Sequence, residues 1–214
     1  DPATTSLMHN AQGNVIGVDS ASYLTVTGLE PRYGALGRPR TGDIESYTRM
    51  AFSPGPSAAG GVLLGLRGTL TWVAGRPQAT GYALHATSGS NAIAIIKRTS
   101  ATGDWTTLAS GTASEPLAYG VRYRMRIQIR GTTLRGRVWR DDAAEPNTWS
   151  VTFNDSASPI ASGRFWFGVV QAAAETREIR FDQMYSKSPT IDVADPPPTN
   201  NHTQTETIVI TDVS

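Results

Sequence analysis

The strongest pattern along this chain is the strict alternation of apolar and polar side chains from Val121 to Arg130. A period of two predicts a β-strand with one buried side and one solvent-facing side, because a helix would spread these residues around its circumference. The predicted buried side carries Val121, Tyr123, Met125, Ile127 and Ile129. The opposite side carries Arg122, Arg124, Arg126, Gln128 and Arg130.

A β-hairpin is predicted at this strand, because Gly131-Thr132 is a turn signal and residues 133–140 alternate again. A two-residue loop places Arg124 opposite Trp139 and Arg126 opposite Arg137, with apolar residues facing one another on the other side. A three-residue loop would oppose apolar to charged positions and is disfavoured. The hairpin carries seven arginines and no acid. Guanidinium groups that face one another on neighbouring strands repel unless carboxylates from a neighbouring strand or a bound anion lie between them.

The remaining pattern consists of short strand signals separated by glycine and proline, without a sustained helical period. We expect roughly twelve strands, and a two-sheet antiparallel jelly-roll sandwich is the all-β architecture that suits this number. Residues 30–42 hold two prolines and three glycines and are predicted to be a loop. Residues 1–188 form the predicted domain, and 189–214 a proline-rich linker with a terminal strand signal at 206–211. That strand would either extend the main sheet or open a further domain.

The composition narrows the function classes. The chain has 214 residues, a net charge of +1 and no cysteine, so strong electrostatic attraction to nucleic acid, disulfides and thiolate metal sites are not expected. No apolar run approaches the roughly 20 residues of a membrane-spanning helix, so we expect no membrane insertion. Because the sequence begins at Asp1, we expect a processed product or a piece of a longer protein.

A family resemblance rests on four stretches beyond residue 119. They are Arg122–Arg126, Gly131–Trp139, Glu145-Pro146-Asn147-Thr148-Trp149, and the later group Gly163, Gly168-Val169 and Phe181-Asp182. This pattern resembles concanavalin A-like lectin/glucanase (laminin-G-like) jelly-roll domains, in particular those of actinobacteriophage minor tail proteins. From its position after the Glu145-Pro146 corner, Trp149 is expected to enter the sandwich as an aromatic anchor.

The resemblance implies a non-catalytic, lectin-like module of a phage minor tail or tail-tip protein, located in the extracellular virion tail. Its implied partners are cell-surface carbohydrate of the host envelope and other phage tail proteins. Nucleic acid is not an expected partner. The alternative is a purely structural tail module that mediates subunit or domain contacts. The sequence leaves open whether the chain forms a homotrimer, although no heptad repeat requires one.

The candidate ligand-binding residues lie on the arginine face and at two tryptophans beside loops. Trp139 would stack on a sugar ring with Arg124 packed against it, while Arg126 and Arg137 contact anionic or hydroxyl groups. The alternative is a solvated face on which the arginines pair with acids from adjacent strands. Trp72 and Trp105 either bind glycan or enter the core. Phe165 and Phe167 share one side of a strand and Trp166 takes the other, so one of these two aromatic surfaces would lie against a partner subunit or domain.

Metal binding and catalysis are the last candidates. Asp141, Asp142 and Glu145 would supply oxygens to a calcium ion at a sheet rim, with Asn154 and Asp155 from the next loop; the alternative is ordinary turn residues, and no other cofactor is expected. Glucanases of this fold carry paired carboxylates in an E-x-D-x-x-E run, which this chain lacks; Asp43-Ile44-Glu45 is the nearest sequence. The three histidines are far apart, so no triad or histidine metal site is expected. We therefore expect a non-enzyme.

Overall fold

The computed structural model describes residues 22–27, 32–52, 60–74, 76–171 and 176–189. The predicted N-terminal segment 1–21, most of the linker and the strand signal at 206–211 lie outside these residues. The described residues form strands and their connections, and they include no helix long and apolar enough to cross a membrane.

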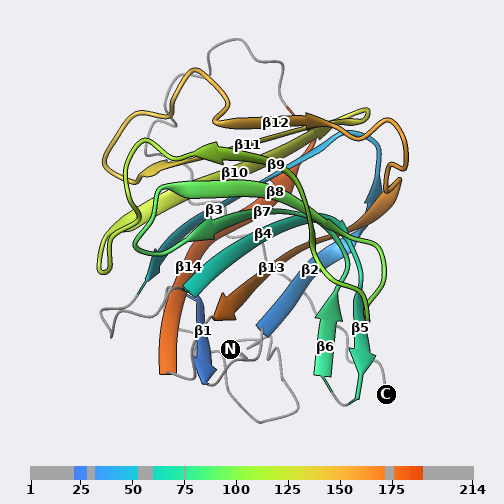
Figure 1. The fold of residues 1–214 in the computed structure, drawn as a ribbon, viewed down its shortest axis with the longest axis horizontal. Coiled ribbons are helices and arrows are strands. Elements are labelled where there is room, and N and C mark those ends of the chain that lie inside the picture. Colours follow the sequence, from blue (N-terminus) through green and yellow to red (C-terminus); the bar gives the residue numbers. More distant parts are fainter. Residues whose placement is uncertain (1–21, 28–31, 53–59, 75, 172–175, 190–214) are drawn as a thin grey trace, which may run out of the picture.

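Two six-stranded antiparallel sheets make up the fold (Figure 1). Sheet A has the order β1 (Ser22–Thr27), β14 (Thr176–Lys187), β3 (Ile44–Phe52), β10 (Arg122–Arg130), β11 (Thr133–Arg140) and β12 (Val151–Asn154). Sheet B has the order β2 (Arg32–Thr41), β13 (Ser162–Gln171), β4 (Gly60–Gly68), β7 (Gly81–Thr87), β8 (Ala92–Arg98) and β9 (Thr106–Thr112). A separate hairpin, β5 (Leu70–Val73) with β6 (Arg76–Ala79), connects β4 to β7. Twelve strands in two packed sheets confirm the predicted all-β jelly-roll sandwich.

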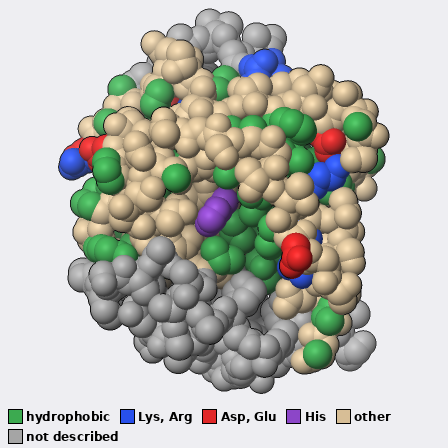
Figure 2. All heavy atoms as spheres, viewed as in Figure 1, with side chains coloured by type: hydrophobic (Ala, Val, Ile, Leu, Met, Phe, Trp, Pro, Cys, Tyr) green, Lys and Arg blue, Asp and Glu red, His purple; other side chains and the backbone are tan. Residues whose placement is uncertain are grey.

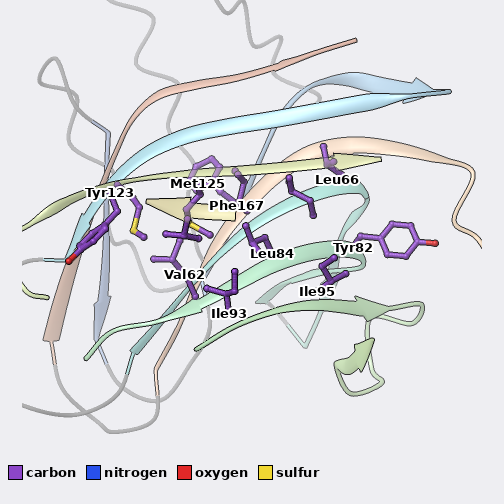
Figure 3. Close-up of a cluster of buried hydrophobic side chains, with 14 of the residues drawn as sticks. Val62, Leu66, Tyr82, Leu84, Ile93, Ile95, Tyr123, Met125 and Phe167 are labelled. Atoms are coloured by element: carbon purple, nitrogen blue, oxygen red, sulfur yellow. The ribbon is translucent and has the colours of Figure 1, made fainter. Parts of the chain in front are cut away.

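The hydrophobic core fills the space between the sheets. Met125 comes from sheet A, whereas Val62, Leu84 and Phe167 come from sheet B, and these side chains point toward one another (Figure 3). Each is fully buried, and burial of such a side chain contributes roughly 1.5–3 kcal/mol before conformational entropy is subtracted. Alternation along each strand therefore sets the inner face of both sheets.

The central hairpin forms as the pattern predicts. Its two-residue turn places Arg130 opposite Thr133, Arg126 opposite Arg137 and Arg124 opposite Trp139. Gly131 has a φ of 56°, a left-handed conformation that glycine adopts without strain. The register is fixed because a slip by one residue would move every apolar side chain to the outer face.

Two strands were missing from the sequence prediction. The segment predicted as a loop at 30–42 contains β2, which among the described strands pairs only with β13 and so forms an edge of sheet B. Pro39 is tolerated there because it lies where the pairing shifts between Gly163 and Phe165, and an edge strand needs hydrogen bonds on one side only. The short strand β6 contains Pro77 and pairs only with β5, which explains why its signal was weak.

Candidate functional site

The outer face of sheet A brings four predicted ligand-binding residues together. Arg124 lies opposite Trp139, and Arg126 lies opposite Arg137, on the neighbouring strands β10 and β11. Residues 141–150, which connect β11 to β12 and which we call the strap, supply groups that contact this face. The four predicted side chains therefore share one face, and the strap contacts this face from the solvent side.

Carboxylates already surround the two central guanidinium groups. Arg126 Nη2 lies 2.6 Å from Glu45 Oε2 of β3, and its Nη1 lies 2.8 Å from Glu145 Oε1 of the strap. Arg137 contacts the same Glu145 carboxylate and donates a hydrogen bond to the carbonyl oxygen of Pro146. Burial alone would lower the pKa of Arg126, but the hydrogen bonds that its guanidinium donates to Glu45 and Glu145 outweigh burial and raise that pKa. The arginines thus pair with acids, as the alternative interpretation predicted, but Arg126 and Arg137 are buried and not solvated, and Glu145 comes from a loop and not from an adjacent strand.

Trp149 lies outside the sandwich, contrary to the sequence expectation. Its ring centroid is 4.2 Å from the guanidinium carbon of Arg137 and 5.5 Å from that of Arg126. A cation over an indole face is an attractive arrangement, and here it caps two guanidinium groups that are already desolvated. The strap therefore runs over the outer face of sheet A and not into the core.

Trp139 offers no exposed ring face to a sugar. Its side chain is 2% exposed, with the Tyr47 ring at 6.2 Å and the Arg137 guanidinium at 5.9 Å. Arg124, which was expected to pack beside a ligand, donates to Asp141 Oδ1 at 2.6 Å. Trp139 is thus covered by its neighbours, and a glycan would have to replace Asp141 at the Nε atom of Arg124.

The three acids proposed for calcium point to arginines instead. Asp141 lies between Arg124 and Arg49, and Asp142 lies 2.8 Å from Arg140. Glu145 belongs to the Arg126 and Arg137 network. Nowhere in the described part of the chain do three histidine or acidic side chains converge as metal ligands. These residues do not fit a calcium site, which needs six to eight oxygen ligands around one point.

The outer face of sheet B, which we call the sheet B face, has a different character. It is apolar and carries few charges; its members are Tyr33, Ala35, Leu63, Ala83, His85, Ala94, Ile96, Trp105, Trp166 and Val170. Large and small residues alternate across neighbouring strands: Trp166 is opposite Gly65, and Leu63 is opposite Gly168. Trp166 lies flat on β4, because a Cβ atom at Gly65 or Gly68 would overlap its indole.

Trp105 covers Trp166 from the solvent side. The two rings stack with centroids 5.5 Å apart and planes inclined by 27°. The Arg98 guanidinium carbon lies 5.7 Å from the Trp105 ring, and Trp105 Nε1 donates a long hydrogen bond of 3.5 Å to the Tyr33 hydroxyl. Burial raises the pKa of Tyr33. Trp105 remains partly exposed, so one edge of this aromatic group is open to solvent.

Trp72 stands at the rim of the sheet B face. It is 58% exposed, and it lies on hairpin β5–β6, beside β2 at one end of sheet B (Figure 1). Leu70 and Ala79, paired at the base of the hairpin, pack against the sheet B face. Because Trp72 follows Leu70 by two residues, it shares the same side of the hairpin. The structure therefore places Trp72 and Trp105 near one face, and Trp139 on the opposite sheet.

Sequence reasoning missed His85, which lies in the middle of the sheet B face. His85 is the one histidine among the described residues, and Figure 2 shows its side chain beside hydrophobic side chains in a hollow. The signal was available in residues 81–87, where Ala83 and His85 alternate with the inward-facing Tyr82, Leu84 and Ala86.

Comparisons with known proteins support the fold. No protein-family model and no curated protein matches the chain. Among solved structures, carbohydrate binding module CBM66 from Bacillus subtilis aligns with a TM-score of 0.59 and 13% identity, over 84% of this chain and 94% of that chain. A legume lectin-like domain from Entamoeba histolytica aligns with a TM-score of 0.54 and 11% identity, over 82% and 87% of the two chains.

The similar structures also include enzymes. An alginate lyase of polysaccharide lyase family 7 aligns with a TM-score of 0.49 and 9% identity, over 83% of each chain. The likeness to these structures concerns the fold alone. The chain has the two-sheet, concanavalin A-like jelly-roll fold found in lectin-like domains and carbohydrate-binding modules.

Proposed function

We propose that this chain is a non-catalytic, lectin-like carbohydrate-binding module of a phage minor tail or tail-tip protein, and that it contacts glycans of the host cell envelope. The observation that carries the glycan-binding part is Trp72, 58% exposed beside an apolar face that also presents the edge of Trp105. An indole contributes a large apolar surface at low entropic cost, and it stacks well on the apolar face of a sugar ring. The phage context rests on the resemblance of residues 119–185 to minor tail proteins.

The sheet B face suits a glycan better than the arginine face does. Trp72 and the exposed part of Trp105 need no rearrangement to meet a ligand. Trp139, in contrast, lies beneath its neighbours, and the strap carboxylate Glu145 occupies the position of an anion. Polar groups at the rim, such as Arg98 and Gln78, joined by a hydrogen bond of 3.0 Å, supply fixed donors and acceptors. A ligand site combines an apolar floor with a few positioned polar groups, and this face has both.

The test is direct titration of the whole chain with isolated cell-wall polysaccharides from high-GC Gram-positive bacteria. Trp72→Ala should weaken saturable binding about tenfold, which corresponds to about 1.4 kcal/mol. Trp149→Ala is the matched control, because it removes a partly exposed tryptophan from the opposite sheet. Thermal unfolding of both variants separates lost binding from lost structure.

Each other outcome has a distinct meaning. Binding lost in Trp149→Ala but kept in Trp72→Ala would move the site to the arginine face. No binding by a folded chain would favour the structural alternative, in which the apolar sheet B face contacts another tail protein or a second copy in a homotrimer; sedimentation would detect the latter. Cleavage of the polysaccharide would contradict the non-catalytic assignment.

The tail location needs a test of its own. An antibody raised against the chain should label the tails of phage particles that contain this protein and slow their adsorption to host cells. Labelling elsewhere in the particle, or none, would contradict the tail assignment while leaving glycan binding unaffected.

A further inference from the structure

His85 occupies the centre of the sheet B face, and no charged side chain among the described residues lies beside it. Its cross-strand partners are Leu63 on β4 and Ala94 on β8, both apolar. A Cβ atom at Gly61 would overlap His85 Nε2 and lie 2.8 Å from Val170 Cγ2, so the imidazole edge rests above the Gly61 backbone. Glycine at this position therefore makes room for the ring.

No group in the described part of the chain forms a hydrogen bond or ion pair with this imidazole. On the outer side of β8 the nearest charged side chain is Arg98, four residues or roughly 13 Å along the strand from Ala94, whereas Lys97 points inward to Asp155. Arg98 is held by Gln78 and by the carbonyl oxygens of Ser100 and Ala101.

The other strands near His85 add no charge on this side. The groups that face it are Gly61, Leu63 and Gly65 from β4, and Gly168 and Val170 from β13; β7 itself adds Ala83 and Thr87. Tyr33 is the titratable residue in the same cross-strand row, with Gly168 and Leu63 between, and Asp104 lies outside the sheet before β9. Burial lowers the pKa of His85, since a charged imidazolium is poorly solvated among these apolar groups.

We propose that His85 is the hydrogen-bonding centre of the glycan site, that it binds sugar hydroxyl groups in its neutral form, and that acidification releases the glycan. This inference rests on the proposed function. A neutral imidazole offers one N–H donor and one lone pair, which match a hydroxyl group that both donates and accepts. The floor around it carries no charge, so the favoured ligand is an uncharged sugar and not an acidic one.

The pH dependence follows from desolvation. A sugar seated over His85 removes the water that remains on the imidazole, and this loss penalises the charged form more than the neutral form. The complex therefore has a lower His85 pKa than the free protein. By linkage, affinity is constant above the free-protein pKa and falls as the pH drops through it.

The experiment compares the whole chain with His85→Phe, which keeps a ring and cannot titrate. Binding to the same cell-wall polysaccharide fraction is measured at pH 7.5 and pH 5.0, and the imidazole is titrated by NMR with and without polysaccharide. We expect wild-type affinity to be lower at pH 5.0 than at pH 7.5, and to fall as the pH drops through the free-chain pKa of the imidazole that NMR reports. In His85→Phe affinity should be weaker at pH 7.5 and nearly equal at both pH values.

The outcomes separate this inference from the proposed function. If wild-type and His85→Phe bind equally and share one pH profile, the inference is overturned and glycan binding stands. If neither binds polysaccharide at any pH, both proposals fail. An imidazole pKa at or above the ordinary value of 6.5 in the free chain would contradict the role given to burial. A neutral polysaccharide and its carboxylated counterpart test the ligand class, and preference for the acidic one would overturn that part.

Discussion

Glu145 Oε1 lies 2.8 Å from Arg126 Nη1 and contacts the Arg137 guanidinium as well, so one strap carboxylate joins two neighbouring strands of sheet A. Both arginines are nearly buried, and Trp149 of the strap caps them. Removal of one partner from such a group leaves buried charge without compensation, which is more costly than the gain from forming the pair.

Glu145→Gln should therefore lower the free energy of unfolding by about 3 kcal/mol, because two desolvated guanidinium groups lose the carboxylate that they share. Urea denaturation measures the change. Asp142→Asn is the control in the same strap, since Asp142 pairs with Arg140 at the surface, and its unfolding curve should overlay the wild-type curve. Equal curves for both variants would show that the strap carboxylate is not needed to hold sheet A.

A second buried cluster closes one end of the sandwich. Asp155 Oδ2 accepts hydrogen bonds from Lys97 Nζ and from the Tyr82 hydroxyl, both at 2.6 Å. Burial alone would raise the pKa of Asp155, but the bonds from Lys97 and Tyr82 outweigh it and lower that pKa. The resulting stability is present above the ordinary value of 3.8 and is lost as the pH falls through the folded-state pKa.

We expect Asp155→Asn to cost about 3 kcal/mol at neutral pH, because it leaves Lys97 buried without its counter-ion. Below pH 5, the free energy of unfolding of this variant should also depend less on pH than that of the wild type. Chemical denaturation at a series of pH values measures the slope of free energy against pH. A slope as steep as that of the wild type would mean that another carboxylate governs acid unfolding.

Tyr82 in the same cluster should lose its phenol proton at a higher pH than an ordinary tyrosine. Burial, followed by the hydrogen bond to Asp155, raises its pKa to about 12. A raised pKa means that the associated stability is complete below pH 10 and is lost as the pH approaches 12. Ultraviolet titration of wild type and Tyr82→Phe isolates this phenol as the difference between the two curves. A difference centred at pH 10 would rule out the buried hydrogen bond.

The stacking of Trp105 on Trp166 depends on small residues beneath it. A Cβ atom at Gly65 would overlap the Trp166 indole, so Gly65→Ala should displace both rings and lower the free energy of unfolding by about 1–3 kcal/mol. Intrinsic fluorescence should shift as the tryptophans move. Gly103→Ala is the matched control, because its added methyl group meets only atoms of Ser100 at 3.6 Å, which is an ordinary contact. This variant should have the free energy of unfolding and the fluorescence of the wild type.

Alternation along the strands was sufficient to predict much of the fold. It gave the register of the β10–β11 hairpin, the all-β class and the opposite sides taken by Phe167 and Trp166. It also grouped Arg124, Arg126, Arg137 and Trp139 on one face. These features are local, because neighbouring residues in a strand point to opposite sides whatever surrounds them.

The tertiary structure decided what covers each outer face. The edge strand β2 was not predicted, because Pro39 and the nearby glycines indicated a loop. This strand forms because β13 lies beside it, and the local sequence does not show that such a partner is present. The strap turned Trp149 outward and enclosed the arginines, whereas the sheet B face collected Trp105 and His85 from segments that are distant from Trp166 in sequence. Alternation shows which side chains share a face, but packing by remote segments determines whether that face meets a core, a covering loop or a ligand.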